Sequence, residues 1–426
     1  MFNRTFGEPI DKRSKVAGKM LITVHKGRRL LRKSGPTCID LFSGAGGLAE
    51  GFRDGGYRIL AGTDVDPDAA ATFRRNFPEA AFFEGDIALL QPEDLLRECD
   101  LRVGGLDCLI GGPPCQAFSY NNHFRSLANV RAGLFRHYIR IVRGLEPKCI
   151  VMENVPGILT IGDGVVVAEI FESLGQLGYE CAVRILFAED YGVPQQRRRV
   201  FFIATRLGCA DTLFPVGTHG PCPKPKDNDL VHRWTRPKRR PRRKIPSVWS
   251  AIGDLPHVQN GGKVSGALRY RHTASTYLQR LLRGRRRRVF NHEPSTLGKK
   301  MLERFTYIPE GGSWRDIPRR LLPKGMRRAE TSDHTKRYGR LAKNGVCSTI
   351  LTKCDPHWGS YIHPVVDRAI TVREAARIQG FSDRFQFDGP RTAQFVQVGN
   401  AVPPLIAKAL AKSVKRHLRD SGAIAS

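Results

Sequence analysis

A cysteine, a glutamate and two arginines are the residues of this chain whose types could do covalent chemistry together. Cys115 follows two prolines in the segment GGPPCQAFS, Glu153 opens the segment ENV, and Arg197 and Arg199 lie in QQRRR. The reactive form of a cysteine is its thiolate, which nearby arginines and the backbone amides of a turn favour. A glutamate whose pKa is raised by burial can act as a proton donor. The set therefore offers a nucleophile, an acid and two cations.

Such a set would suit methylation of a pyrimidine ring at C5. That carbon is a poor nucleophile, but addition of a thiolate at C6 makes it enamine-like and able to attack a methyl group on a sulfonium. An acid such as Glu153 would assist by protonating or hydrogen-bonding N3, and loss of the C5 proton would then release Cys115. A base inside a duplex cannot enter a protein pocket, so it must first flip out.

Each of these residues has a commoner structural role when it is considered alone. A cysteine in a Pro-Pro turn is usually structural, a glutamate at a strand end is usually a solvated cap, and a run of arginines is usually a solvated face. The catalytic interpretation therefore depends on the fold bringing the set together.

The elements that must position these residues lie between Thr37 and Thr205, where short apolar runs alternate with helical patterns. This alternation predicts right-handed βαβ units, hence a Rossmann-like α/β domain with a mostly parallel, seven-stranded sheet. A short loop separates the last two strands, which should form an antiparallel edge pair. The expected strands are Thr37–Leu41, Arg58–Thr63, Ala80–Phe83, Leu106–Ile110, Cys149–Met152, Ala182–Phe187 and Val200–Ala204.

A glycine-rich turn follows the first expected strand, in the segment DLFSGAGG. Its G-x-G-x-x-A spacing, from Gly44 and Gly46 to Ala49, fits the turn between strand and helix in a nucleotide-type fold. Asp64 directly follows the second expected strand, where a carboxylate can accept both ribose hydroxyls. The pattern is compatible with NAD, FAD and S-adenosylmethionine enzymes, and with a plain tight turn.

The carboxyl ends of parallel strands meet at one crevice, and the candidate residues all lie there. The antiparallel last strand would begin at the same edge, which brings the arginines to it. A thiol, a carboxyl and two arginines would thus share a pocket beside a nucleotide-like site. The residues expected to converge are Phe42, Asp64, Asp86, Cys115, Glu153, Arg197 and Arg199.

A net charge of +30 indicates a polyanionic partner, because each Lys or Arg placed on a phosphate releases counterions. Basic residues make up seven of the nine residues in 236–244 and five of the six in 283–288. Charge alone does not separate DNA, RNA and acidic membranes, and a solvated basic surface is the plain alternative. The longest apolar runs are too short for a membrane span. The ten cysteines show no CxxC pair, so we expect intracellular free thiols and no metal site.

Taken together, these segments and others make the sequence similar to the DNA (cytosine-5)-methyltransferase family over most of its length. The segments PCQ and ENV are highly specific together, whereas the glycine loop alone is not. The remaining matching segments, in family order, are DLFSGAGG, DVDP, GDI, QQRRR, REAARIQGF and QVGNAVPP. The position after the second strand departs from the family, which usually has Glu where this chain has Asp64. A second departure is Asn129 in NVR, where an acidic residue commonly precedes Arg131.

The resemblance implies a class I methyltransferase domain and S-adenosylmethionine as methyl donor, with no metal. In that family Cys115 would attack C6 of the flipped cytosine, and Glu153 and Arg199 would hold the base, with Arg197 beside them. Residues 116 to about 131 would close over the DNA. The donor would be bound by Phe42, Gly44, Gly46, Asp64, Asp86, Ile87, Pro114 and Asn400. Expected DNA contacts are Gln116, Ser119, Arg131, Gln195, Arg239 and Arg240.

The role of four donor-site residues has a structural alternative. Phe42 could be a core residue, Asp64 and Asp86 could cap helices, and Asn400 could supply a left-handed turn. We expect a basic, flexible extension over 1–36, a catalytic domain over 37–205, a target-recognition domain over 206–367 and a returning C-terminal segment over 368–426. Within that segment, 371–379 and 404–417 are expected helices.

The function expected from the sequence is methylation of cytosine C5 within a specific site of double-stranded DNA. We expect a cytoplasmic, monomeric enzyme, with a cognate restriction endonuclease acting separately. Two alternatives stay open: a transfer-RNA cytosine-5 methyltransferase on the same scaffold, and a catalytically silent DNA-binding regulator.

Overall fold

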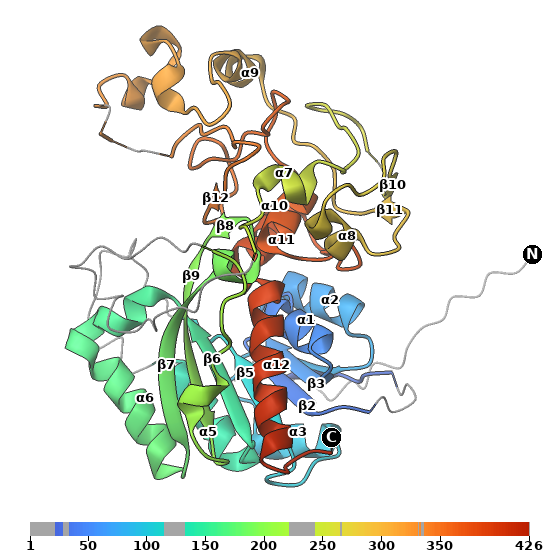
Figure 1. Cartoon of the computed structure of the whole chain (residues 1–426), viewed down its shortest axis with the longest axis vertical. Coiled ribbons are helices and arrows are strands. Elements are labelled where there is room, and N and C mark those ends of the chain that lie inside the picture. The colour runs from blue at the N-terminus through green and yellow to red at the C-terminus, as the bar shows by residue number, and fades with distance from the viewer. Residues whose placement is uncertain are drawn as a thin grey trace, which may run out of the picture.

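A mixed eight-stranded sheet organises the first half of the chain (Figure 1). The computed structural model describes residues 22–28, 34–114, 133–220, 243–264, 266–330, 332–333 and 336–425. Six expected site residues lie outside these ranges: Cys115, Gln116, Ser119, Arg131, Arg239 and Arg240. The strand order is β1-β4-β3-β2-β5-β6-β9-β7.

All seven expected strands are present. Strands β2 to β6 run parallel to one another, while β9 is antiparallel to both β6 and β7, as expected for the edge pair. The carboxyl ends of β2 to β6 therefore share one edge. Their bounds are β2 (Thr37–Leu41), β3 (Arg58–Asp64), β4 (Ala81–Glu84), β5 (Cys108–Gly111), β6 (Cys149–Asn154), β7 (Glu180–Phe187) and β9 (Arg198–Thr205).

The eighth strand, β1 (Thr23–His25), corrects the expectation of a seven-stranded sheet, and it lies within residues 1–36, which were expected to be a flexible extension. It pairs antiparallel with β4 at the sheet edge. Its three residues are too few to show an alternating pattern, and side-chain bonds support it. The His25 ring lies 3.1 Å from Glu84 through Nε2 and 2.8 Å from Nη1 of Arg74 through Nδ1.

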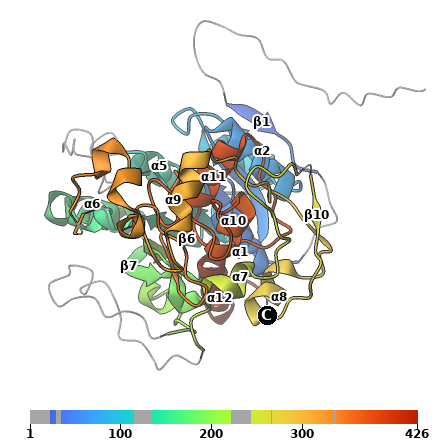
Figure 2. The same ribbon diagram turned by 90° about the horizontal axis from the view of Figure 1, so that it is seen from above.

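Helices cover both faces of this sheet (Figures 1 and 2). One face packs against α1 (Gly47–Asp54), α2 (Pro67–Asn76) and α12 (Pro404–Asp420). The other packs against α3 (Pro92–Glu98), α5 (Phe135–Leu145) and α6 (Val165–Gln176). Helix α12 confirms the expected helix 404–417 and buries one apolar stripe along its length.

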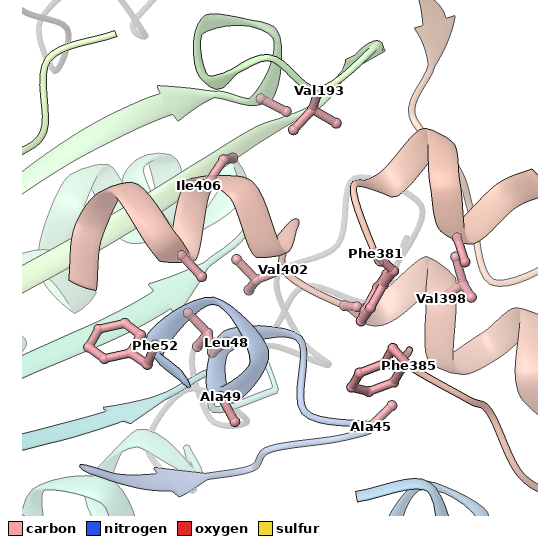
Figure 3. Close-up of a cluster of buried hydrophobic side chains, with 14 of the residues drawn as sticks. Ala45, Leu48, Ala49, Phe52, Val193, Phe381, Phe385, Val398, Val402 and Ile406 are labelled. Carbon is pink, nitrogen blue, oxygen red and sulfur yellow. The ribbon is translucent and has the colours of Figure 1, made fainter. Parts of the chain in front are cut away.

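Glycines let α1 and α12 approach closely. A Cβ on Gly51 would lie 2.3 Å from Cβ of Ala407, and one on Gly55 would lie 2.4 Å from Cβ of Ala411. The last helix is thereby held against the helix that follows the glycine-rich turn. Figure 3 shows the hydrophobic cluster continuing from α1 and α12 to the side chains of Phe381 and Phe385.

The second part of the chain is more irregular than the first. It contains α7 (Val248–Ile252), α8 (Tyr277–Arg283), α9 (Lys299–Thr306) and the short antiparallel pair β10 (Leu268–Arg269) and β11 (Arg288–Val289). Helices α10 (Val372–Gln379) and α11 (Arg391–Asn400) lie between it and the sheet (Figure 1).

Helix α10 carries buried charges, and each has a partner. Arg377 is fully buried and bonds to Asp383 and Asp254. Arg368, just before the helix, makes a bidentate pair with Glu374 at 2.7 and 2.8 Å. Breaking buried pairs of this kind is costly, so they fix α10 against α7 and the following loop. Among the helices of the described residues, none is long and apolar enough to cross a membrane.

Candidate active site

The glycine-rich turn between β2 and α1 has the backbone conformation of a ligand-binding loop. Phe42, Gly44 and Gly46 all have left-handed backbone angles, with φ of 53°, 52° and 98°. For Phe42 this conformation is costly and needs support, which comes from the bond of its N–H to Oγ1 of Thr63 at 3.2 Å. A Cβ on Gly44 would meet no atom within 4 Å among the described residues, so the space over the turn is open.

Asp64 lies directly beside this turn, and its carboxylate shapes the loop. One oxygen accepts the N–H of Gly44 at 2.7 Å, and the other accepts the N–H of Asp66 at 3.0 Å. Burial raises the pKa of Asp64, and these bonds oppose the shift. A ribose could be bound only through the lone pairs that remain, since a carboxylate offers about four acceptor positions.

The ends of β3 and β4 add further groups to the same edge. Asp86 is exposed after β4, with Oδ1 accepting the N–H of Ala88 at 2.9 Å, and Ile87 beside it is buried. Val65, directly after Asp64, is 62% exposed. Sequence reasoning missed Val65, although an apolar residue in a strand-end segment rich in aspartate was a usable signal. An exposed valine at this edge offers an apolar surface for a flat ring.

Asp40 is a second residue that sequence reasoning missed. It is fully buried in β2, and Oδ2 accepts the N–H of Ala49 in the first turn of α1 at 3.2 Å. Its Oδ1 is buried and has no hydrogen-bond partner among the described residues. Burial raises the pKa of Asp40 to about 8, and the charge of Asp64 adds to the shift. An orphaned oxygen beside the glycine turn suits a ligand that brings a donor group or an ordered water.

Asp40→Asn should change the pH dependence of folding. The carboxyl of Asp40 titrates near 3.8 when unfolded and near 8 when folded. Between these values the folded state binds more protons, so the free energy of unfolding should fall as pH rises. Asparagine cannot ionise, so the variant should lose this part of the decline. Urea unfolding at pH ~5 and ~8 measures the difference, and parallel profiles for both proteins would contradict the shift.

Glu153 ends β6 and lies against the turn that leads to Cys115. Its carboxylate is 2.8 Å from Nε of Arg199. A Cβ on Gly112 would lie 3.1 Å from Oε2 of Glu153. The neighbouring Asn154 donates from Nδ2 to the carbonyl of Pro113 at 3.3 Å. Two consecutive β6 residues therefore hold the turn, and the described chain stops at Pro114, one residue before Cys115.

The electrostatics of this pair suit a proton donor. Glu153 is almost fully buried, and burial raises the pKa of its carboxyl, opposed by the charges of Arg199 and Arg197. Burial likewise lowers the pKa of Arg199, opposed by Glu153. The arrangement holds a carboxyl that keeps its proton more readily than one in water, with one oxygen oriented by Arg199.

Two residues of the QQRRR segment are placed differently from expectation. Gln195, expected to contact DNA, is fully buried and cannot do so in this arrangement; its side chain bonds to Ile350 and Gln379. Arg197, expected to face the nucleophile, directs its bonds to main-chain carbonyls of Ile350, Gly399 and Ala401. Both residues lie where β8 (Gln195–Gln196) meets the second part of the chain.

The C-terminal segment returns to the glycine turn. Asn400 ends α11 and is exposed. A Cβ on Gly47 would lie 2.6 Å from the carbonyl oxygen of Val402 and 3.0 Å from Cβ of Ala401, so the segment after Asn400 packs on the first residue of α1. Phe42, Asp64, Asn400 and the turn before Cys115 thus lie on elements that meet at one edge of the sheet.

Comparison with known proteins gives a consistent result. A model of the C-5 cytosine-specific DNA methylase family matches residues 36–416. The Type II methyltransferase M1.HphI of Haemophilus parahaemolyticus is 34% identical, over 89% of this chain and 86% of that protein. The Type II methyltransferase M.AgeI of Thalassovita gelatinovora is 32% identical, over 88% of this chain and 98% of that protein.

A solved structure is similar over the same extent. It is a prophage-encoded protein from E. coli described as a DNA modification methyltransferase, with a TM-score of 0.68 at 26% identity. The match covers 90% of this chain and 100% of that one. The similarity therefore includes the sheet, the irregular second part and the returning C-terminal helices.

Proposed function

The chain belongs to the C-5 cytosine-specific DNA methylase family, and from this premise we propose that it methylates C5 of a cytosine in a specific site of duplex DNA, using Cys115 as nucleophile. The observation that carries the proposal is the arrangement at the end of β6. There Glu153 pairs with Arg199 while Asn154 holds the turn that precedes Cys115. A buried acid beside a nucleophile-bearing turn is what addition to a pyrimidine requires.

S-adenosylmethionine is the donor that the site suits, and it supplies an electrophilic methyl group on a sulfonium. The open space over Gly44, the half-buried Phe42 and the exposed Val65 would accept its adenine. Asp64 would hold the ribose through its free lone pairs, and the orphaned Oδ1 of Asp40 would take up a donor group or a water. Asp86, Ile87, Pro114, Gly46 and Asn400 complete the proposed donor site.

The steps assigned to this chain involve three side chains. The Cys115 thiolate adds to C6 of the flipped cytosine while Glu153 gives a proton or hydrogen bond to N3, which absorbs the developing charge. Arg199 orients the carboxyl of Glu153 through their 2.8 Å contact. After C5 has been methylated, the C5 proton passes to water, N3 returns its proton to Glu153, and the bond between sulfur and C6 breaks, which restores the ring and the thiolate.

Duplex DNA is the acceptor that the charge distribution favours. Residues 206–367 would form the target-recognition domain, and its arginines 285–288 are exposed, as phosphate contacts must be. Arg283, which opens that run, is instead engaged within the domain, stacked over Tyr270 at 3.7 Å from the ring centre. The large irregular basic domain argues against a transfer-RNA acceptor, because a transfer-RNA enzyme of this scaffold would need only a compact insert.

The direct test supplies labelled donor with duplex DNA or transfer RNA as acceptor. We expect label in the DNA and none in the transfer RNA, with release of the C5 proton in step with methyl transfer. Cys115→Ala serves as the blank. Labelling of the transfer RNA alone would replace the proposal with the first alternative, and donor binding without transfer to either acceptor would support a silent regulator.

A partner and an oligomeric state complete the proposal. We infer that the enzyme acts as a monomer and protects DNA from a separate restriction endonuclease of the same specificity, as the type II names of its relatives suggest. Sedimentation at working concentration should give a mass near the 47.6 kDa of one chain. A dimer that dissociates only with loss of activity would contradict the monomer.

A further inference from the structure

Arg197 lies at a junction of three segments that are far apart in the sequence. Its Nη1 donates to the carbonyl of Ile350 at 3.0 Å, and its Nη2 donates to the carbonyls of Gly399 and Ala401 at 2.7 and 3.0 Å. Its side chain is buried, with 1% of the residue exposed. The guanidinium therefore ties the edge of the catalytic sheet to Ile350 in the second part of the chain. It also ties that edge to the turn between α11 and α12.

The same three segments are joined by neutral bonds around Arg197. Gln195 accepts the N–H of Ile350 at 3.0 Å and donates to the side chain of Gln379, which in turn donates to the carbonyl of Ala401 at 2.6 Å. Strand β8 pairs in parallel with β12 (Cys347–Ser348), and the hydroxyl of Thr349 donates to the carbonyl of Gln196 at 2.6 Å. The junction is thus a continuous network of hydrogen bonds.

Steric contact fixes the remaining side of the junction. A Cβ on Gly399 would lie 2.6 Å from the carbonyl carbon of Leu351 and from the amide nitrogen of Thr352, both of which are backbone atoms. Backbone atoms cannot move aside as a flexible side chain can, so only glycine fits. The end of α11, which carries Asn400, is therefore seated directly on the recognition-part segment 350–352.

The partners of Arg197 distinguish a positioning role from a catalytic one. No ion pair among the described residues includes it, and its guanidinium bonds go to carbonyl oxygens. Two of these carbonyls lie at the C-terminal end of α11, where the helix dipole stabilises a cation. Its hydrogen bonds are thereby directed toward the junction, although its charge also opposes the burial that raises the pKa of Glu153. Arg199, two residues later, is the arginine that contacts Glu153.

We propose that Arg197 is a positioning residue that locks the recognition-domain segment 347–352 to the α11–α12 turn, so that the DNA-reading and donor-binding halves of the site hold one fixed geometry. This rests on the proposed function for the identity of the two ligands. Its consequence is that the loss of Arg197 weakens donor binding from a position outside the donor pocket. The role predicted from sequence, a cation for the Cys115 thiolate, has the opposite consequence: a slower reaction with unchanged donor affinity.

The test compares Arg197→Met with Arg199→Met in the full-length protein, titrated with S-adenosylhomocysteine in the absence of DNA. Arg197→Met should weaken binding by about tenfold or more, since three charge-assisted bonds are lost, and should raise KM for donor and DNA more than it lowers kcat. Arg199→Met should keep wild-type affinity and lose kcat. Arg197→Lys, which keeps the charge, should recover part of the affinity.

A second variant approaches the junction from the other side. Gly399→Ala should reproduce the effect of Arg197→Met, because its Cβ would push segment 351–352 away from α11. Gly175→Ala is the matched control: Gly175 also lies in a helix, α6, but a Cβ there would meet no atom within 4 Å among the described residues. Arg206→Met is the control for loss of an arginine next to β9, on a side chain that bonds to Glu146 instead.

Hydrogen exchange gives a readout that does not depend on activity. Peptides covering 347–352 and 398–402 should exchange faster together in Arg197→Met and in Gly399→Ala, and in neither control. Wild-type donor affinity and unchanged exchange in both junction variants would overturn the inference. If the wild-type protein binds no S-adenosylhomocysteine, yet the two junction variants show the paired exchange effect, the proposed function is contradicted and the junction stands.

Discussion

Replacing Cys115 with alanine is expected to abolish methyl transfer to DNA while donor binding stays at the wild-type level. Without the thiolate, C6 is not attacked and C5 stays a poor nucleophile, so the rate should fall by on the order of 10⁴-fold or more. Serine at this position should be nearly as inactive, because a hydroxyl is far less ionised than a thiol. Labelled methyl transfer and S-adenosylhomocysteine titration measure the two halves of the prediction.

The matched control for this variant is Cys209→Ala, which removes an exposed free cysteine shortly after the end of β9. It should transfer methyl groups at the wild-type rate. A duplex carrying 5-fluorocytosine adds a positive readout, since fluorine cannot leave as a proton does and the adduct through sulfur should accumulate. Measurable turnover by Cys115→Ala, or an adduct mapped to another cysteine, would remove Cys115 from the mechanism.

Glu153→Gln is expected to lower kcat by about 10²- to 10⁴-fold, the usual range for loss of a positioned acid. Glutamine keeps the shape and can still accept from Arg199, but it has no proton to give to N3. Donor affinity should be unchanged, because Glu153 lies with the turn before Cys115 rather than at the glycine loop. Single-turnover rates with saturating donor and DNA isolate the chemical step.

The pH dependence of the wild-type single-turnover rate gives a second test of Glu153. Burial disfavours the carboxylate and raises the pKa of Glu153, so the proton-donating form persists above the range of an ordinary glutamate. The single-turnover rate should therefore fall as pH rises through that raised pKa, and Glu153→Gln should lack this limb. Equal rates for the two proteins, or the same falling limb in both, would exclude Glu153 as the acid.

The strand-ends that form the site could be predicted from sequence because parallel topology has few solutions. Short apolar runs separated by helical patterns place Phe42, Asp64, Asp86 and Glu153 at one edge, and this is where the strands end. Strand β1 could not be predicted, because three partly exposed residues at an edge depend on tertiary partners such as Glu84.

The direction of a side chain was harder to predict than its position along the chain. Arg197 and Arg199 are two residues apart, which in a regular strand would put them on the same face. The chain breaks between β8 and β9 at Arg197, so it turns toward Ile350 while Arg199 meets Glu153. Gln195 is buried for the same reason, since β8 pairs with a strand of the second part of the chain.

The role of Asp64 could be predicted only in part from its residue type. A carboxylate after the second strand was expected to bind a ribose, but its short side chain already accepts the N–H groups of Gly44 and Asp66. Its placement beside the glycine turn was predictable, while its partners depend on the left-handed angles of that turn.

Bisulfite sequencing of DNA from cells that express the wild-type chain tests the central claim most directly, with cells expressing Cys115→Ala as the reference. The account predicts methylated cytosines in one recurring short sequence in the first culture and none in the second. Identical methylation patterns in the two cultures, in experiments where both proteins are present and folded, would contradict it.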